Sequence, residues 1–189
     1  MKAYKDFIVS PIGERYNNSK KIGEKELILN TEIFNHQYVN RKAIVIATPL
    51  LFQSPINVGD EVIVHHNVFR RWHDIKAREK NSRSYLEEDK YLVQVDQIFL
   101  YNKKAMPGYS FIKPLKRDSK YNINNEKPLV GVVKYSDGEF DKNELVGFRP
   151  GSEYEFIING ERLYRVLNKF INVKYEYQGN EEEYNPSWA

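Results

Sequence analysis

Short stretches of alternating or continuous apolar residues recur along this chain, and they predict strands rather than helices. They cover residues 6–12, 42–50, 58–66, 90–101, 109–115, 127–136, 152–166 and 168–177. Residues 90–101 alternate until the pattern shifts at Ile98. Asn159-Gly160 lies between two apolar-rich arms and predicts a hairpin with a type I′ turn, which needs positive φ at both central residues. About eight short strands separated by turns are typical of all-β barrels or sandwiches.

The order of these stretches repeats once along the chain. Four pairs of segments are similar: 8–15 with 111–117, 43–47 with 129–133, 61–66 with 144–149, and 90–101 with 162–173. Identity within each pair is low, so the comparison depends on their common order. The halves meet near residues 102–110, where Pro107-Gly108 interrupts the strand pattern. The sequence therefore predicts a tandem duplication.

The composition indicates a globular chain without disulfides. Apolar residues make up 41% of the 189 residues, which is enough for a core. The net charge is only +3, so an acidic partner is not required. There is no cysteine, which excludes a disulfide framework and thiolate chemistry. The start lacks the apolar core of a signal peptide, and no run approaches the roughly 20 apolar residues that span a bilayer. We expect a cytoplasmic protein without membrane contact.

The sequence contains no recognisable reaction centre. It has no nucleophile elbow, phosphate loop or dinucleotide fingerprint. His65, His66 and His73 lie near Asp74 in the sequence, but adjacent residues of a strand point to opposite faces, and no spacing typical of a zinc site occurs. We therefore expect no enzyme activity, no metal and no cofactor.

Residues 70–84 carry many basic residues with aromatic residues beside them. The basic residues are Arg70, Arg71, Lys76, Arg78, Lys80 and Arg83, and Phe69 and Trp72 lie beside them. Such a mixture can hold single-stranded nucleic acid on a β-barrel. The alternative, which we favour, is a solvated loop, because Asp74 and Glu79 dilute the positive charge. We expect no nucleic-acid partner, and strong salt dependence of binding would argue otherwise.

Five features in the first half, over about residues 5–103, occur in an order that resembles the GroES-like co-chaperonins, the 10-kDa chaperonin family. They are Ile8-Val9-Ser10-Pro11-Ile12, a polar loop at about 16–40 with the apolar triplet Leu27-Ile28-Leu29, Ala43-Ile44-Val45-Ile46-Ala47, Val58-Gly59-Asp60-Glu61-Val62, and Tyr91-Leu92-Val93 with Asp96-Gln97-Ile98. The second half resembles a more diverged copy. The resemblance does not explain the long insert at residues 67–89.

The resemblance implies an all-β fold of two tandem GroES-like, partly open β-barrels. The first would cover residues 1–103 with a long mobile loop at about 16–40, and the second residues 107–177. Residues 178–189 would form an acidic flexible tail, as their composition also suggests.

The resemblance also implies a function. In the family the apolar triplet docks on the apical groove of a chaperonin and the ring of subunits caps the folding chamber. The chaperonin-binding residues would be Leu27, Ile28 and Leu29. The expected partners are a GroEL-like chaperonin ring and further copies of this chain in a homo-oligomeric ring.

Two alternatives stay open. The triplet would instead be an ordinary strand if Leu27 and Leu29 were buried against a neighbour. The protein would be a structural or assembly protein, for example a virion component, if it kept the barrel without chaperonin binding. Lys25-Glu26 in place of a glycine pair favours that view, as does the short stretch 48–56 in place of a roof hairpin. A virus-encoded origin would place the protein in the host cytoplasm or the virion.

Overall fold

The computed structural model describes residues 2–16, 19–23, 25–28, 38–117 and 125–187. The described residues form an all-β structure, and the helical elements η2 (Val95–Gln97) and η3 (Asn168–Phe170) are single 3₁₀ turns. The chain divides into two compact units, residues 1–102 and 103–189. None of the described helices has the length and apolar character needed to cross a membrane.

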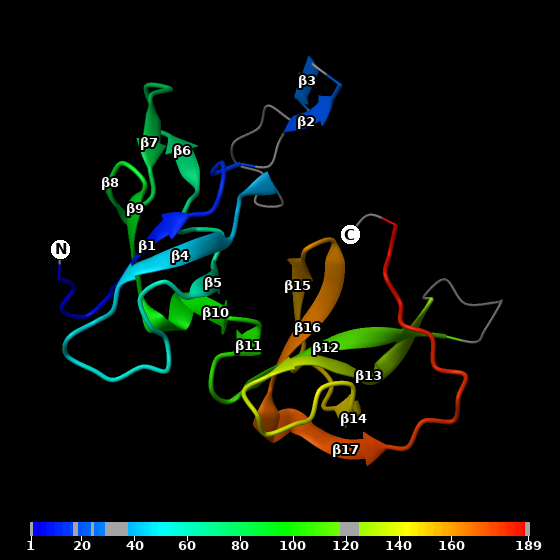
Figure 1. Ribbon diagram of the computed structural model, residues 1–189. Coiled ribbons are helices and arrows are strands. Elements are labelled where there is room, and N and C mark those ends of the chain that lie inside the picture. Colours follow the sequence, from blue (N-terminus) through cyan, green and yellow to red (C-terminus); the bar gives the residue numbers. More distant parts are fainter. Residues whose placement is uncertain (1, 17–18, 24, 29–37, 118–124, 188–189) are drawn as a thin grey trace. The chain divides into compact units, whose positions relative to one another are not determined.

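Unit 1 is built on one antiparallel sheet, which we call its main sheet (Figure 1). Within residues 1–102 its strands lie in the order β10-β5-β4-β1-β9-β8. Their bounds are β1 (Phe7–Pro11), β4 (Lys42–Ala47), β5 (Glu61–Val64), β8 (Tyr85–Glu87), β9 (Lys90–Val93) and β10 (Ile98–Tyr101). Two hairpins form separate two-stranded sheets, and they consist of β2 (Ser19–Ile22) with β3 (Lys25–Ile28), and β6 (Arg71–His73) with β7 (Glu79–Asn81).

Unit 2 begins with the two-residue strand β11 (Lys104–Ala105) and contains a six-stranded sheet in the order β15-β16-β12-β13-β14-β17. The strands of this sheet are β12 (Tyr109–Lys116), β13 (Glu126–Ser136), β14 (Leu145–Phe148), β15 (Tyr154–Ile158), β16 (Glu161–Leu167) and β17 (Ile171–Tyr175). The predicted hairpin turn is confirmed. Asn159 (φ 54°) and Gly160 (φ 77°) join β15 to β16, and both have the positive φ that a type I′ turn requires.

The two units follow one topology. The order β10-β5-β4-β1-β9-β8 in unit 1 corresponds to β17-β14-β13-β12-β16-β15 in unit 2. The irregularities correspond as well, because the β1–β4 ladder shifts register between Ile8 and Val9, and the β12–β13 ladder between Phe111 and Ile112. A 3₁₀ turn also lies at the same place in each unit, because η2 directly precedes β10 and η3 directly precedes β17. Both strand orders are linear, so neither sheet closes into a complete barrel within the described residues.

The sheet of unit 2 buries side chains on both faces. Successive residues of a strand point to opposite faces, so Val132 and Val133 belong to different clusters. One cluster contains Ile112, Val133, Val146, Phe148, Val166 and Ile171. The other contains Leu115, Val132 and Leu145. The second cluster therefore needs cover from outside the sheet.

The C-terminal segment pairs with β12 beside this second cluster. β16 pairs with β12 only as far as Ile112, which leaves the end of β12 open on that side. The Lys116 N–H donates to the Glu182 carbonyl oxygen at 2.7 Å, and the Tyr184 N–H donates to the Pro114 carbonyl oxygen at 2.8 Å. Residues 182–184, within the stretch expected from composition to be a flexible tail, thus place peptide groups along this open strand edge.

Side chains of unit 2 also recognise this segment. Lys113 is only 3% exposed, and its Nζ donates to Asn185 Oδ1 at 2.6 Å. Burial lowers the pKa of the Lys113 amine, with nearby acidic groups acting in the opposite direction. Lys134 forms an ion pair with Glu183. The polar composition that suggested a loose tail thus supplies the acceptors that basic residues of the sheet need.

We expect Asn185→Ala to loosen the C-terminal segment. Asn185 accepts hydrogen bonds from Lys113 Nζ at 2.6 Å and the Arg162 N–H at 2.9 Å, and it donates to the Gly160 carbonyl oxygen at 2.9 Å. Leaving the buried Lys113 amine without its acceptor costs about 1–3 kcal/mol of unfolding free energy. Amide hydrogen exchange at Tyr184 would measure the loosening. Asn180→Ala is the matched control in the same segment, and equal exchange in both variants would contradict the prediction.

Candidate functional site

The described part of the apolar triplet lies on a hairpin outside the main sheet of unit 1. Leu27 and Ile28 belong to β3 and pair with Lys20 and Ser19 of β2. Leu29 lies outside the described residues. Leu27 is 52% exposed, and Ile22 on β2 is 59% exposed. The β2–β3 hairpin therefore presents apolar side chains to solvent.

The ends of the predicted loop at 16–40 are held together. Tyr16 and Val39 form an antiparallel bridge, and the Asn40 N–H donates to the Arg15 carbonyl oxygen at 2.9 Å. The buried Asn40 side chain donates to the carbonyl oxygens of Ile12 at 2.8 Å and Glu14 at 2.9 Å. It also accepts from the Lys42 N–H at 2.9 Å. We call Arg15, Tyr16, Val39 and Asn40 the loop root.

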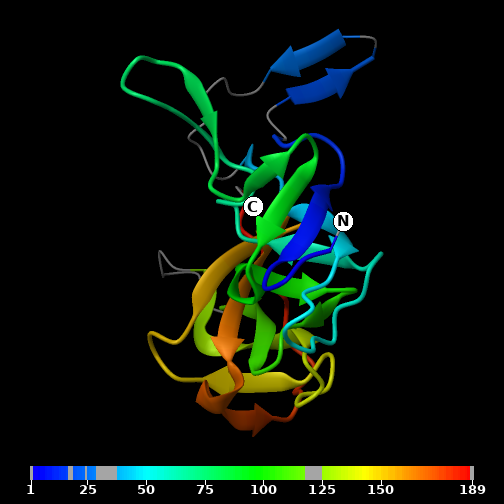
Figure 2. The same ribbon diagram turned by 90° about the vertical axis from the view of Figure 1, so that its left-hand side faces the viewer.

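The insert at 67–89, for which the resemblance gave no role, is anchored in unit 1. Val68 and Phe69 are both fully buried. The Phe69 ring meets the buried Tyr91 ring edge to face, with 4.8 Å between their centroids. The Ser82 hydroxyl donates to the Val68 carbonyl oxygen at 2.6 Å. These contacts fix both ends of the β6–β7 hairpin, which extends away from the main sheet (Figure 1 and Figure 2).

The insert contacts the loop root directly. The Arg15 guanidinium donates to the Phe69 carbonyl oxygen at 2.9 and 3.2 Å and to Asn81 Oδ1 at 2.8 Å. The Tyr16 hydroxyl accepts from the Arg71 N–H at 2.7 Å. The Arg71 guanidinium also lies 4.8 Å from the centre of the Tyr16 ring. The loop root and the β6–β7 hairpin are thus joined by charged and neutral hydrogen bonds.

We expect Arg15→Met to separate the insert from the loop root. The change removes three hydrogen bonds and leaves the Phe69 carbonyl oxygen without this donor, at a cost of about 1.5–3 kcal/mol in unfolding free energy. Urea unfolding followed by Trp72 fluorescence, in a Trp188→Phe background, would measure the loss. Arg78→Met is the control at the far end of the hairpin, since it removes a solvent-exposed pair with Asp74 that contributes little to stability. Equal losses in the two variants would contradict the prediction.

His65 and His66 lie just after the end of β5, and His73 is the last residue of β6. β5 ends at Val64, so the rule that neighbours point to opposite faces does not hold for His65 and His66, and their rings lie 4.2 Å apart. Burial lowers the pKa of His65, as does the charge of Arg41, while Asp96 opposes them. Among the described residues, no group of three histidine, cysteine or acidic side chains could hold a metal ion.

The basic stretch at 70–84 is partly neutralised within the hairpin. Arg71 pairs with Glu79 at 2.8 Å, and Arg78 pairs with Asp74 at 3.1 Å. The Trp72 indole N–H donates to the Asn81 carbonyl oxygen at 3.1 Å. These pairs reduce the positive field that nucleic acid would require.

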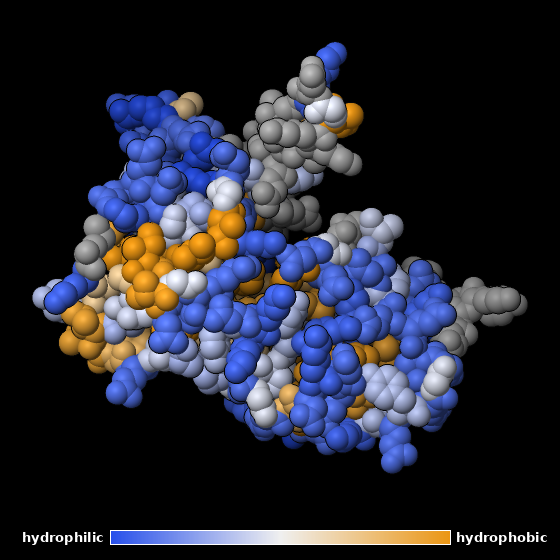
Figure 3. All heavy atoms as spheres, in the orientation of Figure 1, coloured by the Kyte–Doolittle hydropathy of each residue, from blue (hydrophilic) through white to orange (hydrophobic). Residues whose placement is uncertain are grey.

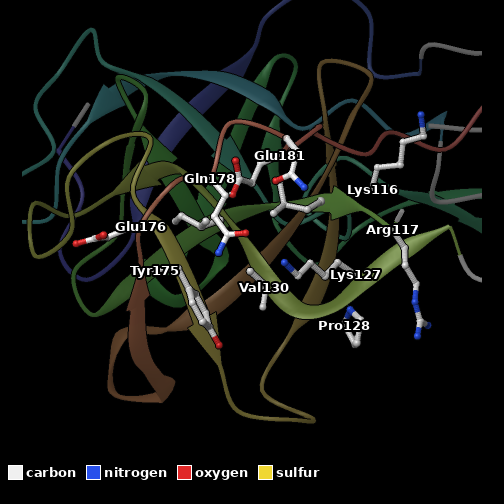
Figure 4. A pocket seen from close by; sticks show the side chains of 12 residues that line it. Lys116, Arg117, Lys127, Pro128, Val130, Tyr175, Glu176, Gln178 and Glu181 are labelled. Carbon is white, nitrogen blue, oxygen red and sulfur yellow. Dashed lines mark hydrogen bonds between the residues drawn. The ribbon is translucent and has the colours of Figure 1, made fainter. Parts of the chain in front are cut away.

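Sequence reasoning missed a groove in unit 2 of about 580 Å³ (Figure 4). Leu115, Val130 and Leu145 contribute apolar surface to its lining. Lys116, Arg117 and Lys127 gather on one side in Figure 4, opposite Glu176 on the segment that follows β17. The lining comes from separate stretches of the chain, so no local pattern could have revealed it. No serine, histidine or cysteine is among the described lining residues, so the groove pairs no such nucleophile with a histidine base.

The arrangement offers an apolar contact element on a fixed root. Leu27 is exposed on the β2–β3 hairpin, while Tyr16 and Asn40 hold the ends of the segment that carries it. Such an element can bind a groove on another protein. Neither the models of known protein families nor the curated proteins contain a match to this chain.

Proposed function

We propose that this chain is a co-chaperonin-like protein that engages a chaperonin ring through Leu27, Ile28 and Leu29 and assists protein folding. The observation that carries the proposal is the half-exposed Leu27 on a hairpin that is separate from the main sheet of unit 1. A strand of the core would bury this side chain. An exposed apolar side chain on a separate hairpin suits transient contact with a partner instead.

The physics of attachment favours several weak contacts. Full burial of one Leu or Ile side chain contributes about 1.5–3 kcal/mol. A two-stranded hairpin alone is marginally stable, so ordering it on the partner uses part of that gain and keeps each contact reversible. In a homo-oligomeric ring, several copies would bind one chaperonin ring together, and their effective concentration would convert weak contacts into firm attachment.

The assignment of both units as GroES-like, partly open barrels is part of the proposal. Its support is the common strand order of the two units and the position of the long loop between the first two strands of the main sheet, β1 and β4. The corresponding connection in unit 2 joins β12 to β13 and is shorter, and most of it lies outside the described residues. Its interior apolar residues are Tyr121 and Ile123. We therefore assign one chaperonin-binding element to each chain.

The direct test is complex formation with a bacterial chaperonin in the presence of nucleotide, followed by light scattering and co-sedimentation. We expect the full chain to form a complex that a synthetic peptide of residues 19–33 displaces. A peptide of the same composition in scrambled order is the control. No complex in any nucleotide state would contradict the proposal and favour a structural or assembly protein that keeps the fold without chaperonin binding.

A further inference from the structure

The tip of the β6–β7 hairpin is a fixed turn. Asp74 Oδ1 accepts hydrogen bonds from the Lys76 N–H at 2.9 Å and the Arg78 N–H at 3.0 Å. The Ala77 N–H donates to the Asp74 carbonyl oxygen at 2.9 Å, and Ala77 has a φ of 56°. A turn with this many internal hydrogen bonds loses little conformational freedom when it binds a partner.

Ile75 lies inside this fixed turn, between Asp74 and Ala77. Its side chain is fully exposed (102%), more than any other large apolar side chain in the described part of the chain. Turns favour Gly, Pro, Asn, Asp and Ser, so a β-branched apolar residue there is not explained by turn formation. Trp72 on β6 is 46% exposed. The surface over β6 and β7 is otherwise largely hydrophilic, as Figure 3 shows.

The hairpin and the segment at 16–40 leave unit 1 from one place. Arg15 and Tyr16 of the loop root contact Phe69, Arg71 and Asn81 at the base of the hairpin. Ile75 lies four residues beyond Arg71, or about 13 Å along an extended strand. Leu27 lies eleven residues beyond Tyr16, at most about 40 Å of chain. A protein surface that holds Leu27 is therefore within reach of Ile75.

We propose that the β6–β7 hairpin is a second attachment point for the same chaperonin ring, with Ile75 as its contact residue and Trp72 beside it. The inference rests on the proposed function. Lys76 and Lys80 flank these two side chains, so the matching surface is an apolar pocket with carboxylates at its edge. Because the turn is fixed and the root is shared, the second contact forms at high effective concentration once the triplet has bound.

The experiment compares the full-length wild type with Ile75→Ser and Leu86→Ser for binding to a bacterial chaperonin with nucleotide, by titration calorimetry. Leu86 is 41% exposed on β8 of the same insert, which makes Leu86→Ser the matched control. Ile75→Ser is expected to weaken binding about tenfold or more, the loss expected for an apolar contact residue. Leu86→Ser is expected to bind like the wild type. Ile75→Ser is expected to leave folding unchanged, because the Ile75 side chain is fully exposed.

The outcomes separate failure of the second attachment point from failure of the proposed function. A wild type that binds, with Ile75→Ser binding equally well, overturns the second attachment point and leaves the proposed function intact. Equal weakening by Ile75→Ser and Leu86→Ser also overturns it, because the loss would then not be specific to the hairpin tip. A wild type that forms no complex overturns the proposed function, and the second attachment point to that ring with it.

Discussion

Replacing Leu27, Ile28 and Leu29 by serine together is expected to weaken binding to a bacterial chaperonin by at least about 100-fold. Loss of two buried apolar contacts already removes about 3 kcal/mol, and each 1.4 kcal/mol corresponds to about tenfold in affinity. A ring with several such elements loses more, because every copy is affected. Light scattering of mixtures with chaperonin and nucleotide would measure the loss.

The same triple substitution is expected to leave thermal unfolding nearly unchanged. Leu27 is 52% exposed, and its hairpin is not a strand of the main sheet of unit 1. The matched control places serine at Val58, Val95 and Val173, which are 63%, 42% and 45% exposed and lie far apart in the sequence. Retained binding by the triplet variant would contradict its role. A clearly lower melting temperature would instead identify the triplet as a structural strand.

Gly131→Val is expected to destabilise unit 2 by about 3 kcal/mol, near the upper end for overpacking. A Cβ atom on Gly131 would lie 2.4 Å from the Lys113 carbonyl oxygen and 2.6 Å from Ile112 Cγ2. Both are held in the β12–β13 ladder, where Gly131 is paired with Pro114, so the backbone cannot move aside cheaply. Urea unfolding monitored by hydrogen exchange of β13 amides would measure the cost.

Gly131→Ala and Gly147→Ala test whether the close backbone approach is the cause. The clash begins at Cβ, so alanine at position 131 is also expected to destabilise unit 2. A Cβ on Gly147 would meet Tyr175 Cε2 at 2.9 Å, and that ring is 43% exposed and can rotate away. Gly147→Ala is therefore expected to cost under about 1 kcal/mol. Tolerance of alanine at position 131 would contradict the close approach.

Local patterns in the sequence predicted most of the strands. Alternation in residues 90–101 indicated a strand, and the shift at Ile98 marks the end of η2, which separates β9 from β10. Asn159-Gly160 predicted its hairpin because the turn chemistry is local. The half-exposure of Leu27 was not predictable, because a polar-flanked apolar residue fits a buried strand and an exposed hairpin equally well.

The register of the repeat could not be read from the sequence. The sequence comparison matched Ala43 with Leu129, but the ladders place Ala43 opposite Pro11 and Gly131 opposite Pro114. β13 has a register shift here, and Leu129 has a φ of 60°. A bulge adds residues to one strand without changing its apolar pattern, so low identity hides the offset.

The remaining differences come from contacts between distant residues. The C-terminal segment was expected to be loose because it is acidic, yet Lys113 and Lys134 provide its partners from β12 and β13. The resemblance offered no role for the insert at 67–89, yet Phe69 is buried and Arg15 binds its carbonyl oxygen. The local hydrophobic periodicity of the sequence does not reveal such pairs, because each joins segments that are far apart in the chain.

The repeated ladders also create a problem for the folding chain. With corresponding bulges in the two units, β1 can in principle pair with β13, and β12 with β4, while keeping much of the native backbone hydrogen bonding. Differences between side chains must therefore disfavour pairing with the wrong strand. Lys113 stands where unit 1 has Ser10, and outside unit 2 this lysine would lose the Asn185 oxygen that stabilises it. We therefore expect the buried Lys113 to favour the native pairing of β12 over pairing with β4.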